Sequence, residues 1–215
     1  MKPRIALIDY GMGNLRSVGK ALELAGADVR VTSDKRAIIA SDAVVLPGVG
    51  SFGPATSYLR VKGLDKTVKA QVASGKPYLG LCLGFQFLFT ESSEEGKHKG
   101  FDIIGGKVKK FDFSSNRTLK KKLKIPHMGW NRVEQNPVKG KMFNGIKDGS
   151  FFYFVHSYYA DPADKAAISG TTNYGFDFCS AVETGNIWAC QFHPEKSGAT
   201  GIRLLRNFVN EVKRR

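Results

Sequence analysis

The first half of the chain alternates short β-prone runs with amphipathic segments of helical period, and this alternation constrains the fold most. The runs predicted as strands are Arg4–Asp9, Asp28–Thr32 and Ala43–Leu46. The segments predicted as helices are Leu15–Ala25, Pro54–Leu59 and Leu64–Ser74. Strands separated by helices of this length predict βαβ units, and therefore a parallel sheet with helices on its faces.

From about Gly96 the pattern changes, and β-prone runs dominate until a last amphipathic helix at Thr200–Val212. The strongest of these runs are Gly105–Phe113, Phe151–Val155 and Ile187–Phe192. The predicted fold class is α/β, with a mostly parallel central sheet, flanking helices and antiparallel strands added in the second half. With 215 residues the chain is long enough for one such domain, spanning residues 1–215.

The stretch from Pro77 to Gln86 places Cys82 between an apolar run and a segment of helical character, Phe85–Phe89. Gly80 and Gly84 flank the cysteine, which is the layout of a nucleophile elbow with sulfur in place of the serine hydroxyl. A helix that begins just after Cys82 would aim backbone N–H groups at the sulfur and favour the thiolate. A small buried hydrophobic residue is the common alternative for a cysteine, and the local pattern fits both.

A thiolate nucleophile that must also protonate a leaving group needs a histidine, and the chain has four. His98 lies in a lysine-rich loop, and His127 lies in a predicted loop with no carboxylate nearby in sequence. His156 ends a predicted buried strand and is a serious rival. His193 also ends such a strand, and Glu195 stands two positions on, where it could accept a hydrogen bond from the imidazole. The elbow cysteine, His193 and Glu195 therefore form the best available triad.

Two glycine-rich loops follow predicted strands and reach the same edge of the sheet. Tyr10–Asn14 partly matches a dinucleotide-binding fingerprint, but Arg16 occupies the place of the third glycine, so we interpret it as a turn. Pro47–Gly53 is rich enough in glycine for its backbone amides to approach a substrate and donate to an oxyanion beside Cys82. An ordinary flexible loop is the alternative for this segment.

Cysteine usage and hydropathy indicate a protein of the reducing cytoplasm. The three cysteines have no paired spacing, which argues against a disulfide framework, and Cys179 and Cys190 are expected to fill the core. The N-terminal apolar run is too short for a signal peptide, and no segment reaches the length of a membrane span. No two cysteines or histidines show metal-ligand spacing, so we expect neither a metal nor another cofactor.

The net charge of +14 raises a competing hypothesis, because a strongly basic domain attracts polyanions. Lysines cluster on both sides of Phe111 and Phe113, and basic residues interleaved with aromatic ones could bind nucleic acid. A solvated face, or attraction to an acidic partner or phosphorylated metabolites, is the alternative. We favour that alternative and expect no nucleic-acid partner, because the chain contains no recognisable nucleic-acid motif.

Gly80–Gln86 together with Phe192–Glu195 resembles the class I (triad) glutamine amidotransferase family, whose cysteine hydrolyses the side-chain amide of glutamine. Three further stretches, Asp9–Asn14, Pro126–Asn131 and Phe154–Tyr158, extend the resemblance over the whole chain and narrow it to a branch that works in histidine biosynthesis. The resemblance implies the flavodoxin-like fold of this family. It also implies a heterodimer with a (β/α)₈-barrel cyclase, which would use the ammonia to make imidazole glycerol phosphate and an aminoimidazole carboxamide ribotide.

The resemblance implies a role for each matched residue. Cys82 would be the nucleophile, His193 the general base and acid, and Glu195 its orienter. The backbone amides that would hold the oxyanion are those of Leu83 and of the turn at Val49 and Gly50. The residues that would grip the glutamine are Gly50, Gln86, Ser157 and Tyr158. The residues that would face the cyclase and line the passage for ammonia are Asn14, Trp130 and Lys196.

Two other functions stay open on the sequence. One is a paralogous glutaminase subunit that supplies ammonia to a different synthase, for example in sugar amidation, and the other is a non-catalytic polyanion-binding domain. The segment Phe111–Lys124 is longer and more basic than the family pattern, and the resemblance implies no role for it.

Overall fold

The computed structural model describes residues 1–136 and 140–215. Its parallel strands lie in the order β2–β1–β3–β4–β13, and each pairs with its neighbour in parallel register. The bounds of these strands are β1 Arg4–Ile8, β2 Asp28–Thr32, β3 Ala43–Leu46, β4 Tyr78–Leu81 and β13 Ile187–Cys190. Because parallel strands end at one edge of a sheet, the loops after β3, β4 and β13 meet there.

The second half of the chain adds antiparallel pairs to this sheet, as the sequence predicts. The path continues from β13 through β12, β10, β7 and β5 to β6, while β11, β8 and β9 branch off β12. Among the described strands of this part, β5 and β7 pair in parallel and the other pairs are antiparallel. The bounds are β5 Phe89–Ser92, β6 His98–Lys99, β7 Ile104–Lys110, β8 His127–Gln135, β9 Ser150–His156, β10 Tyr158–Pro162, β11 Ile168–Asn173 and β12 Asp177–Thr184.

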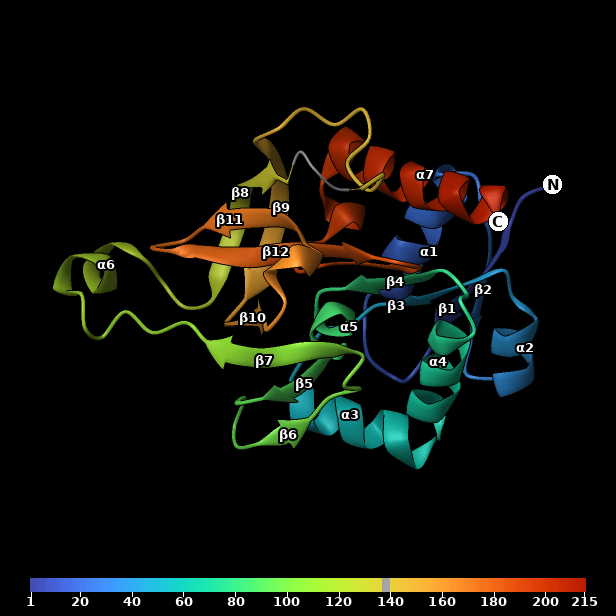
Figure 1. Cartoon of the computed structure of the whole chain (residues 1–215), viewed down its shortest axis with the longest axis horizontal. Coiled ribbons are helices and arrows are strands. Elements are labelled where there is room, and N and C mark those ends of the chain that lie inside the picture. The colour runs from blue at the N-terminus through green and yellow to red at the C-terminus, as the bar shows by residue number, and fades with distance from the viewer. Residues whose placement is uncertain (137–139) are drawn as a thin grey trace.

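Helices cover both faces of the parallel strands (Figure 1). On one face lie α1 Leu15–Leu24 and α7 Gly198–Arg214, and on the other lie α2 Lys35–Ala40, α3 Phe52–Val61 and α4 Leu64–Ala73. The remaining helices are α5 Leu83–Gln86, α6 Arg117–Lys122, and the short 3₁₀ turns η1 Lys165–Ala167 and η2 Pro194–Lys196. The N- and C-termini lie side by side, since Met1 and Arg215 line one shallow depression.

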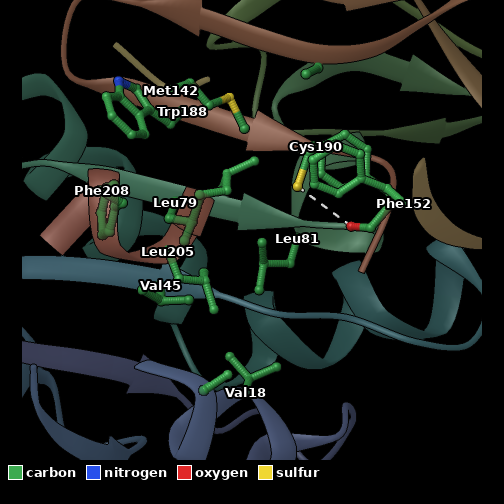
Figure 2. Packing of buried hydrophobic residues seen from close by; sticks show 14 of the residues in the cluster. Val18, Val45, Leu79, Leu81, Met142, Phe152, Trp188, Cys190, Leu205 and Phe208 are labelled. Atoms are coloured by element: carbon green, nitrogen blue, oxygen red, sulfur yellow. Dashed lines mark hydrogen bonds between the residues drawn. The ribbon is translucent and has the colours of Figure 1, made fainter. Parts of the chain in front are cut away.

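Alternation along the strands divides the core between these two faces. In β1, Ile5 and Leu7 pack with α1 and α7, while Ala6 and Ile8 pack with α2, α3 and α4. Figure 2 shows the first cluster, with labelled side chains from β3, β4, α1 and α7 gathered against the sheet. Strands buried on both faces read as continuous apolar runs, which is why their positions were predictable from the sequence.

The predicted strands Asp28–Thr32 and Ala43–Leu46 are confirmed to the residue, and the predicted helices form with shifted ends. One helical prediction is wrong in extent. The sequence predicts helical character over Phe85–Phe89, but α5 ends at Gln86 and Phe89 begins β5, where it pairs with Ile104 of β7. Pairing between distant segments overrides local helical character there.

Two histidines lie in strands rather than loops, contrary to the sequence prediction. His127 is buried at the start of β8 and pairs in register with His156 of β9. His98 lies in β6, where it pairs with Ser92 and its ring packs against Gly53. In both cases the strand partner is not an immediate neighbour in sequence, so no local signal marks the strand.

The basic segment also differs from the nucleic-acid interpretation of its sequence. Phe111 and Phe113 are buried, with 1% and 5% relative exposure, and pack in the core. They therefore cannot offer a stacking surface to nucleic acid. Beyond them, Lys120, Lys121 and Lys122 lie on α6, which stands away from the parallel strands (Figure 1), and Lys124 follows this helix.

No described helix is long and apolar enough to cross a membrane.

Candidate active site

Cys82 lies between β4 and α5, with backbone angles that side-chain-bearing residues rarely adopt. Its φ is 53° and its ψ is −104°. A sharp turn from a strand into a helix imposes such strain on a nucleophile. Hydrogen bonds hold the turn: the Cys82 N–H donates to the Cys190 carbonyl at 2.8 Å, and the N–H groups of Phe85 and Gln86 each donate to the Cys82 carbonyl at 3.1 Å.

The two glycines that flank Cys82 permit the close approach of strand and helix. A Cβ added to Gly80 would lie 2.7 Å from the Gly84 carbonyl oxygen, which is closer than real Cβ atoms come. A Cβ added to Gly84 would collide with the carbonyl oxygen of Leu46 in β3. Glycine is therefore required at both positions for α5 to sit on the sheet with the cysteine at its start.

His193 follows β13, and its ring forms a buried pair with Glu195. The Nδ1 atom lies 2.7 Å from Oε1 of Glu195, and the two side chains are 4% and 1% exposed. Burial alone would lower the pKa of His193, but the charge of Cys82 and the hydrogen-bonded carboxylate of Glu195 raise it to about 10. The other ring nitrogen, Nε2, has no hydrogen-bond partner among the described residues, so it is the atom available to exchange a proton with the Cys82 sulfur.

The backbone around His193 is fixed by a closed set of hydrogen bonds. The His193 N–H donates to the Tyr153 carbonyl at 2.9 Å, and the Tyr153 N–H donates to the Ser197 hydroxyl at 3.0 Å. That hydroxyl donates in turn to the His193 carbonyl at 2.6 Å. The histidine is thus anchored to β9 as well as to β13, which limits movement of its ring relative to the cysteine.

A cavity of about 350 Å³ opens where the loops after β3, β4 and β13 meet. The sequence-predicted residues that line it are Val49, Gly50, Cys82, Leu83, Gln86, Ser157, Tyr158 and His193. Glu195 lies behind His193, and Asn14, Trp130 and Lys196 lie outside the lining. The structure therefore brings the predicted catalytic and glutamine-binding positions to one site and places the predicted partner-facing positions elsewhere.

The turn at Gly48 to Gly50 packs tightly against the elbow. A Cβ on Gly48 would lie 2.5 Å from the Leu83 Cβ and 2.7 Å from the Tyr10 hydroxyl, so glycine is required. Gly50 has a φ of +95°, a conformation that glycine adopts without strain. The backbone of this turn therefore comes close to the start of α5 at Gly48.

Glu94 also lines the cavity, although no feature of the sequence singles it out. It is the only carboxylate among the described lining residues, and its Oε2 accepts a hydrogen bond at 2.7 Å from the Phe52 N–H at the start of α3. Burial raises the pKa of Glu94. No local motif surrounds Glu94, because its position depends on the packing of β5 and β6 beside α3.

Gln191 is a second residue that sequence reasoning missed. Its side chain is fully buried, its Nε2 lies 3.6 Å from the Cys82 sulfur, and its Oε1 accepts from Gln86 Nε2 at 2.9 Å. The one signal in the sequence is a single amide, at the last position but one of the apolar run Ile187–Phe192. A polar side chain there must find partners inside the protein.

His156, the rival for the catalytic base, lines the cavity but has neutral partners. Its Nδ1 lies 2.8 Å from the Tyr158 carbonyl, and its Nε2 lies 3.0 Å from Nδ1 of His127. Burial lowers the pKa of His156 to about 3 and that of His127 to about 4. Neither ring has the carboxylate partner that His193 has, so His156 is poorly suited to hold a proton during the reaction.

Trp130 and Lys196 lie on an exposed face that borders the site. On β8 and β9 the side chains of this face pair in register as Met128 with Val155, Trp130 with Tyr153 and Arg132 with Phe151. Lys196 Nζ lies 5.6 Å from the Tyr153 ring centroid, and Val155 also lines the cavity. We call the six paired side chains from Met128 to Arg132 and from Phe151 to Val155 the β8–β9 face, and Lys196 lies beside it. Met128 and Trp130 are the most exposed apolar residues of this face, with 62% and 57% relative exposure.

Asn14 caps α1, and its side chain accepts from the Ser17 N–H at 3.3 Å.

Among the described residues, no group of three or more histidine, cysteine, aspartate or glutamate side chains could hold a metal ion.

The model of the family described as "Glutamine amidotransferase class-I" matches residues 6–212. The chain belongs to this family. Imidazole glycerol phosphate synthase subunit HisH of Rhodopirellula baltica is 47% identical over 205 residues, which cover 95% of this chain and 96% of that relative. The protein of the same name from Moorella thermoacetica is 47% identical over 213 residues, covering 99% of this glutamine amidotransferase and 97% of the relative.

Solved structures share the fold of this glutamine amidotransferase. A crystal structure described as that of a glutamine amidotransferase superposes with a TM-score of 0.73 at 18% identity, covering 97% of this chain and 98% of that one. PurLQS from Thermotoga maritima gives a TM-score of 0.70 at 19% identity, with 98% and 99% of the two chains covered. At these identities the likeness concerns the fold, and it confirms the predicted class I glutamine amidotransferase architecture.

Proposed function

We propose that the chain is the glutaminase subunit of imidazole glycerol phosphate synthase in histidine biosynthesis, and that Cys82, His193 and Glu195 form its catalytic triad. The observation that carries the glutaminase assignment is the strained elbow cysteine beside a buried histidine–carboxylate pair in one cavity. The pathway assignment rests on relatives that are 47% identical along nearly the whole chain. Residues 1–215 act as one glutamine amidotransferase domain, in the cytoplasm, where the three buried free cysteines stay reduced.

The triad carries out amide hydrolysis in two stages. The Cys82 thiolate attacks the side-chain carbonyl carbon of glutamine, and the His193 imidazolium gives a proton to the departing ammonia. The product is a glutamyl thioester on Cys82. His193 then takes a proton from water, which attacks the thioester carbon, and glutamate leaves as the carbon–sulfur bond breaks. Glu195 holds the ring through Nδ1, so that Nε2 faces the reacting atoms in both stages.

Both stages pass through a tetrahedral oxyanion, which needs hydrogen-bond donors aimed at it. We assign these to the Leu83 N–H at the start of α5 and to an N–H of the Val49–Gly50 turn. The first N–H groups of a helix have no partner within the helix, and the turn is packed against Leu83. Each such donor is worth about 3 to 4 kcal/mol of barrier, so a partner that adjusts this turn would change the rate strongly.

The cavity offers partners for both the side-chain amide and the α-ammonium group of the substrate glutamine. Gln86 uses Nε2 to donate to the Tyr158 carbonyl and to Gln191, so its oxygen is the atom we assign to the substrate amide. The backbone of Ser157 and Tyr158 and that of Gly50 line the remaining walls. We assign the α-ammonium group of glutamine to Glu94, because it is the carboxylate that the cavity presents.

The partner is a (β/α)₈-barrel cyclase that forms a heterodimer with this chain and consumes the ammonia. The β8–β9 face supports this, because it is exposed, partly apolar and continuous with the cavity through Val155. Trp130 and Lys196 lie on or beside that face, and we assign them, with Asn14, to the interface and the ammonia passage. A protein interface of this kind is enriched in tryptophan, methionine and arginine, as this face is.

Replacing the nucleophile tests the proposal. In the assembled complex, Cys82→Ala should release no ammonia from glutamine, while the complex still makes imidazole glycerol phosphate when ammonium salt is supplied directly. Cys179→Ala is the matched control, since Cys179 is also a buried free cysteine but lies outside the cavity lining. Ammonia release by Cys82→Ala at the wild-type rate would refute the assignment.

A further inference from the structure

Gln191 is neither a member of the triad nor a residue assigned to glutamine binding, yet its side chain contacts both Cys82 and Gln86. It directly follows β13 and is fully buried. Its side-chain amide lies between the nucleophile and the substrate-binding glutamine, with Nε2 3.6 Å from the Cys82 sulfur and Oε1 2.9 Å from Gln86 Nε2. A buried amide with both ends engaged is held in one orientation.

The direction of these hydrogen bonds is set by the Tyr158 carbonyl, which can only accept. Gln86 must therefore present its NH₂ group to that carbonyl, and does so at 3.1 Å. The same NH₂ group faces Gln191, so Gln191 must turn its oxygen toward Gln86. The only arrangement left places the Gln191 NH₂ group against the Cys82 sulfur. The Tyr158 carbonyl therefore determines the orientation of the Gln191 amide through Gln86, which hydrogen-bonds to both.

A second donor fixes that carbonyl from another side. His156 Nδ1 lies 2.8 Å from the Tyr158 oxygen, so this nitrogen carries the hydrogen. His156 Nε2 then accepts from His127 Nδ1 at 3.0 Å, and His127 Nε2 accepts from Asn131 Nδ2 at 3.2 Å. The Tyr158 carbonyl is therefore held between Gln86 and a pair of neutral rings anchored on β8 and β9.

We propose that Gln191 is a further catalytic residue of the glutaminase, which donates an N–H to the Cys82 sulfur and stabilises its thiolate. This inference rests on the proposed function. The donor acts before attack, when the sulfur is a free thiolate, and again when the thioester is hydrolysed. In that second stage the carbon–sulfur bond breaks, its electron pair returns to sulfur, and the same N–H stabilises the departing thiolate. Between the two stages the thioester sulfur is a poorer acceptor, so the contact favours the free thiolate over the acylated form.

The other titratable groups that face Cys82 from the packed elements are His193, Tyr10 and Cys190. His193 supplies a cationic donor. Burial raises the pKa values of Tyr10 and Cys190 and keeps both neutral, with smaller contributions from Glu195 at Cys190 and from the Cys82 charge at both. Gln191, unlike these groups, does not titrate, so its effect on the Cys82 thiolate does not change with pH. Removing the Gln191 donor should therefore shift the pH midpoint at which the Cys82 thiolate forms, without introducing another titrating group.

The test is the pH dependence of Cys82 alkylation by iodoacetamide, followed by peptide mass spectrometry on the purified chain. Gln191→Met keeps the length of the side chain and removes the donor. We expect the alkylation midpoint to rise by about one pH unit, because hydrogen bonds to charged groups are worth about that much. Gln191→Leu also removes the donor and adds no charge, so its midpoint should rise as far. This second variant serves if Gln191→Met does not fold.

Gln135→Met is the matched control. Gln135 also uses its Nε2 for two hydrogen bonds, to the Ile146 and Lys147 carbonyls, but it lies on β8 away from the cysteine. Its alkylation midpoint should equal that of the wild type. If folded Gln191→Met or Gln191→Leu had the wild-type midpoint, the inference would be wrong. Alkylation reads the Cys82 thiolate whatever substrate the enzyme uses, so this result is independent of the Cys82→Ala test of the glutaminase assignment.

Discussion

Two buried histidine sites lie beside one cavity and behave in opposite ways. His156 ends β9 and His193 lies three residues beyond the end of β13; both line the cavity and both are almost fully buried. Yet the pKa of His193 is raised to about 10, and burial lowers the pKa of His156 to about 3. The difference lies in their partners. His193 is hydrogen-bonded to the Glu195 carboxylate and lies in the field of the Cys82 charge. His156 is hydrogen-bonded to the Tyr158 carbonyl and to the neutral ring of His127.

Burial alone therefore does not decide the role of a histidine. A buried ring with anionic partners keeps its proton and can deliver it to a leaving group. A buried ring with neutral partners loses its proton and becomes a fixed donor and acceptor, suited to holding a backbone carbonyl in place. If this contrast is correct, substitutions at the two sites should differ in kind as well as in size.

The largest effect is expected at His193. His193→Asn removes the acid and base, and the rate of ammonia release from glutamine should fall by roughly 10²- to 10⁴-fold or more. The measurement is glutaminase turnover in the assembled complex. The ammonia-dependent reaction of the same complex is the control and should be unchanged. A loss of less than about tenfold would mean that His193 is not the base.

The next effect is expected at Glu195. Glu195→Gln keeps the shape of the side chain but removes its charge, so the imidazolium loses stabilisation and its orientation is less well fixed. We expect kcat for ammonia release to fall by roughly 10²- to 10⁴-fold, with a smaller change in KM. The pKa of His193, followed by the NMR shifts of its ring, should fall toward its usual value. An unchanged pKa would show that Glu195 does not provide the charge.

A smaller effect on turnover, but a clear one on stability, is expected at the neutral pair. His156→Leu leaves the Tyr158 carbonyl with one donor fewer and leaves His127 Nδ1 without its acceptor. The free energy of unfolding in urea should fall by about 1 to 3 kcal/mol. The KM for glutamine should rise while kcat falls much less than in His193→Asn. Equal losses of kcat in the two variants would erase the distinction between the sites.

The last prediction concerns the pH dependence of stability, which should have opposite signs at the two sites. The folded chain holds a proton on His193 up to about pH 10, above the usual imidazole pKa of 6.5. That contribution is complete below pH 6.5 and is lost as the pH rises through 10. His156 stays neutral down to about pH 3, so its contribution is complete above pH 6.5 and is lost as the pH falls toward 3.

Urea unfolding across this pH range measures both contributions. Cys82→Ala removes the largest of the charges that raise the pKa of His193, so the alkaline decline in stability should be less steep than in the wild type. His156→Leu should reduce the acid decline and leave the alkaline one unchanged. If both variants had the wild-type profile, the opposite pKa shifts would not contribute to stability.

Features that depend on local motifs could be predicted from the sequence. The elbow around Cys82 requires glycines within two positions, and Glu195 stands two residues after His193, so these features were visible along the chain. The parallel strands β1, β3, β4 and β13 were predictable for a similar reason, because burial on both faces leaves continuous apolar runs. The edge strand β2 is mostly exposed and was predicted from its β-prone residues instead.

Features that depend on contacts between distant segments could not be predicted in this way. Gln191 meets Cys82 across 109 positions, and Glu94 reaches the start of α3 across 42. The sequence predicts a loop at His127, although this residue pairs with His156 of β9, 29 positions on. Polar residues of this kind carry no periodic signal, since their partners are set by the sheet order rather than by neighbouring residues.

The central claim is that Cys82 is the nucleophile that attacks glutamine, and labelling with a chloroketone analogue of glutamine tests it most directly. Peptide mass spectrometry of the labelled complex should find one adduct, on the peptide that contains Cys82, and free glutamine should slow its formation. An adduct on Cys179 or Cys190 instead, or labelling of Cys82 that glutamine does not slow, would contradict the account.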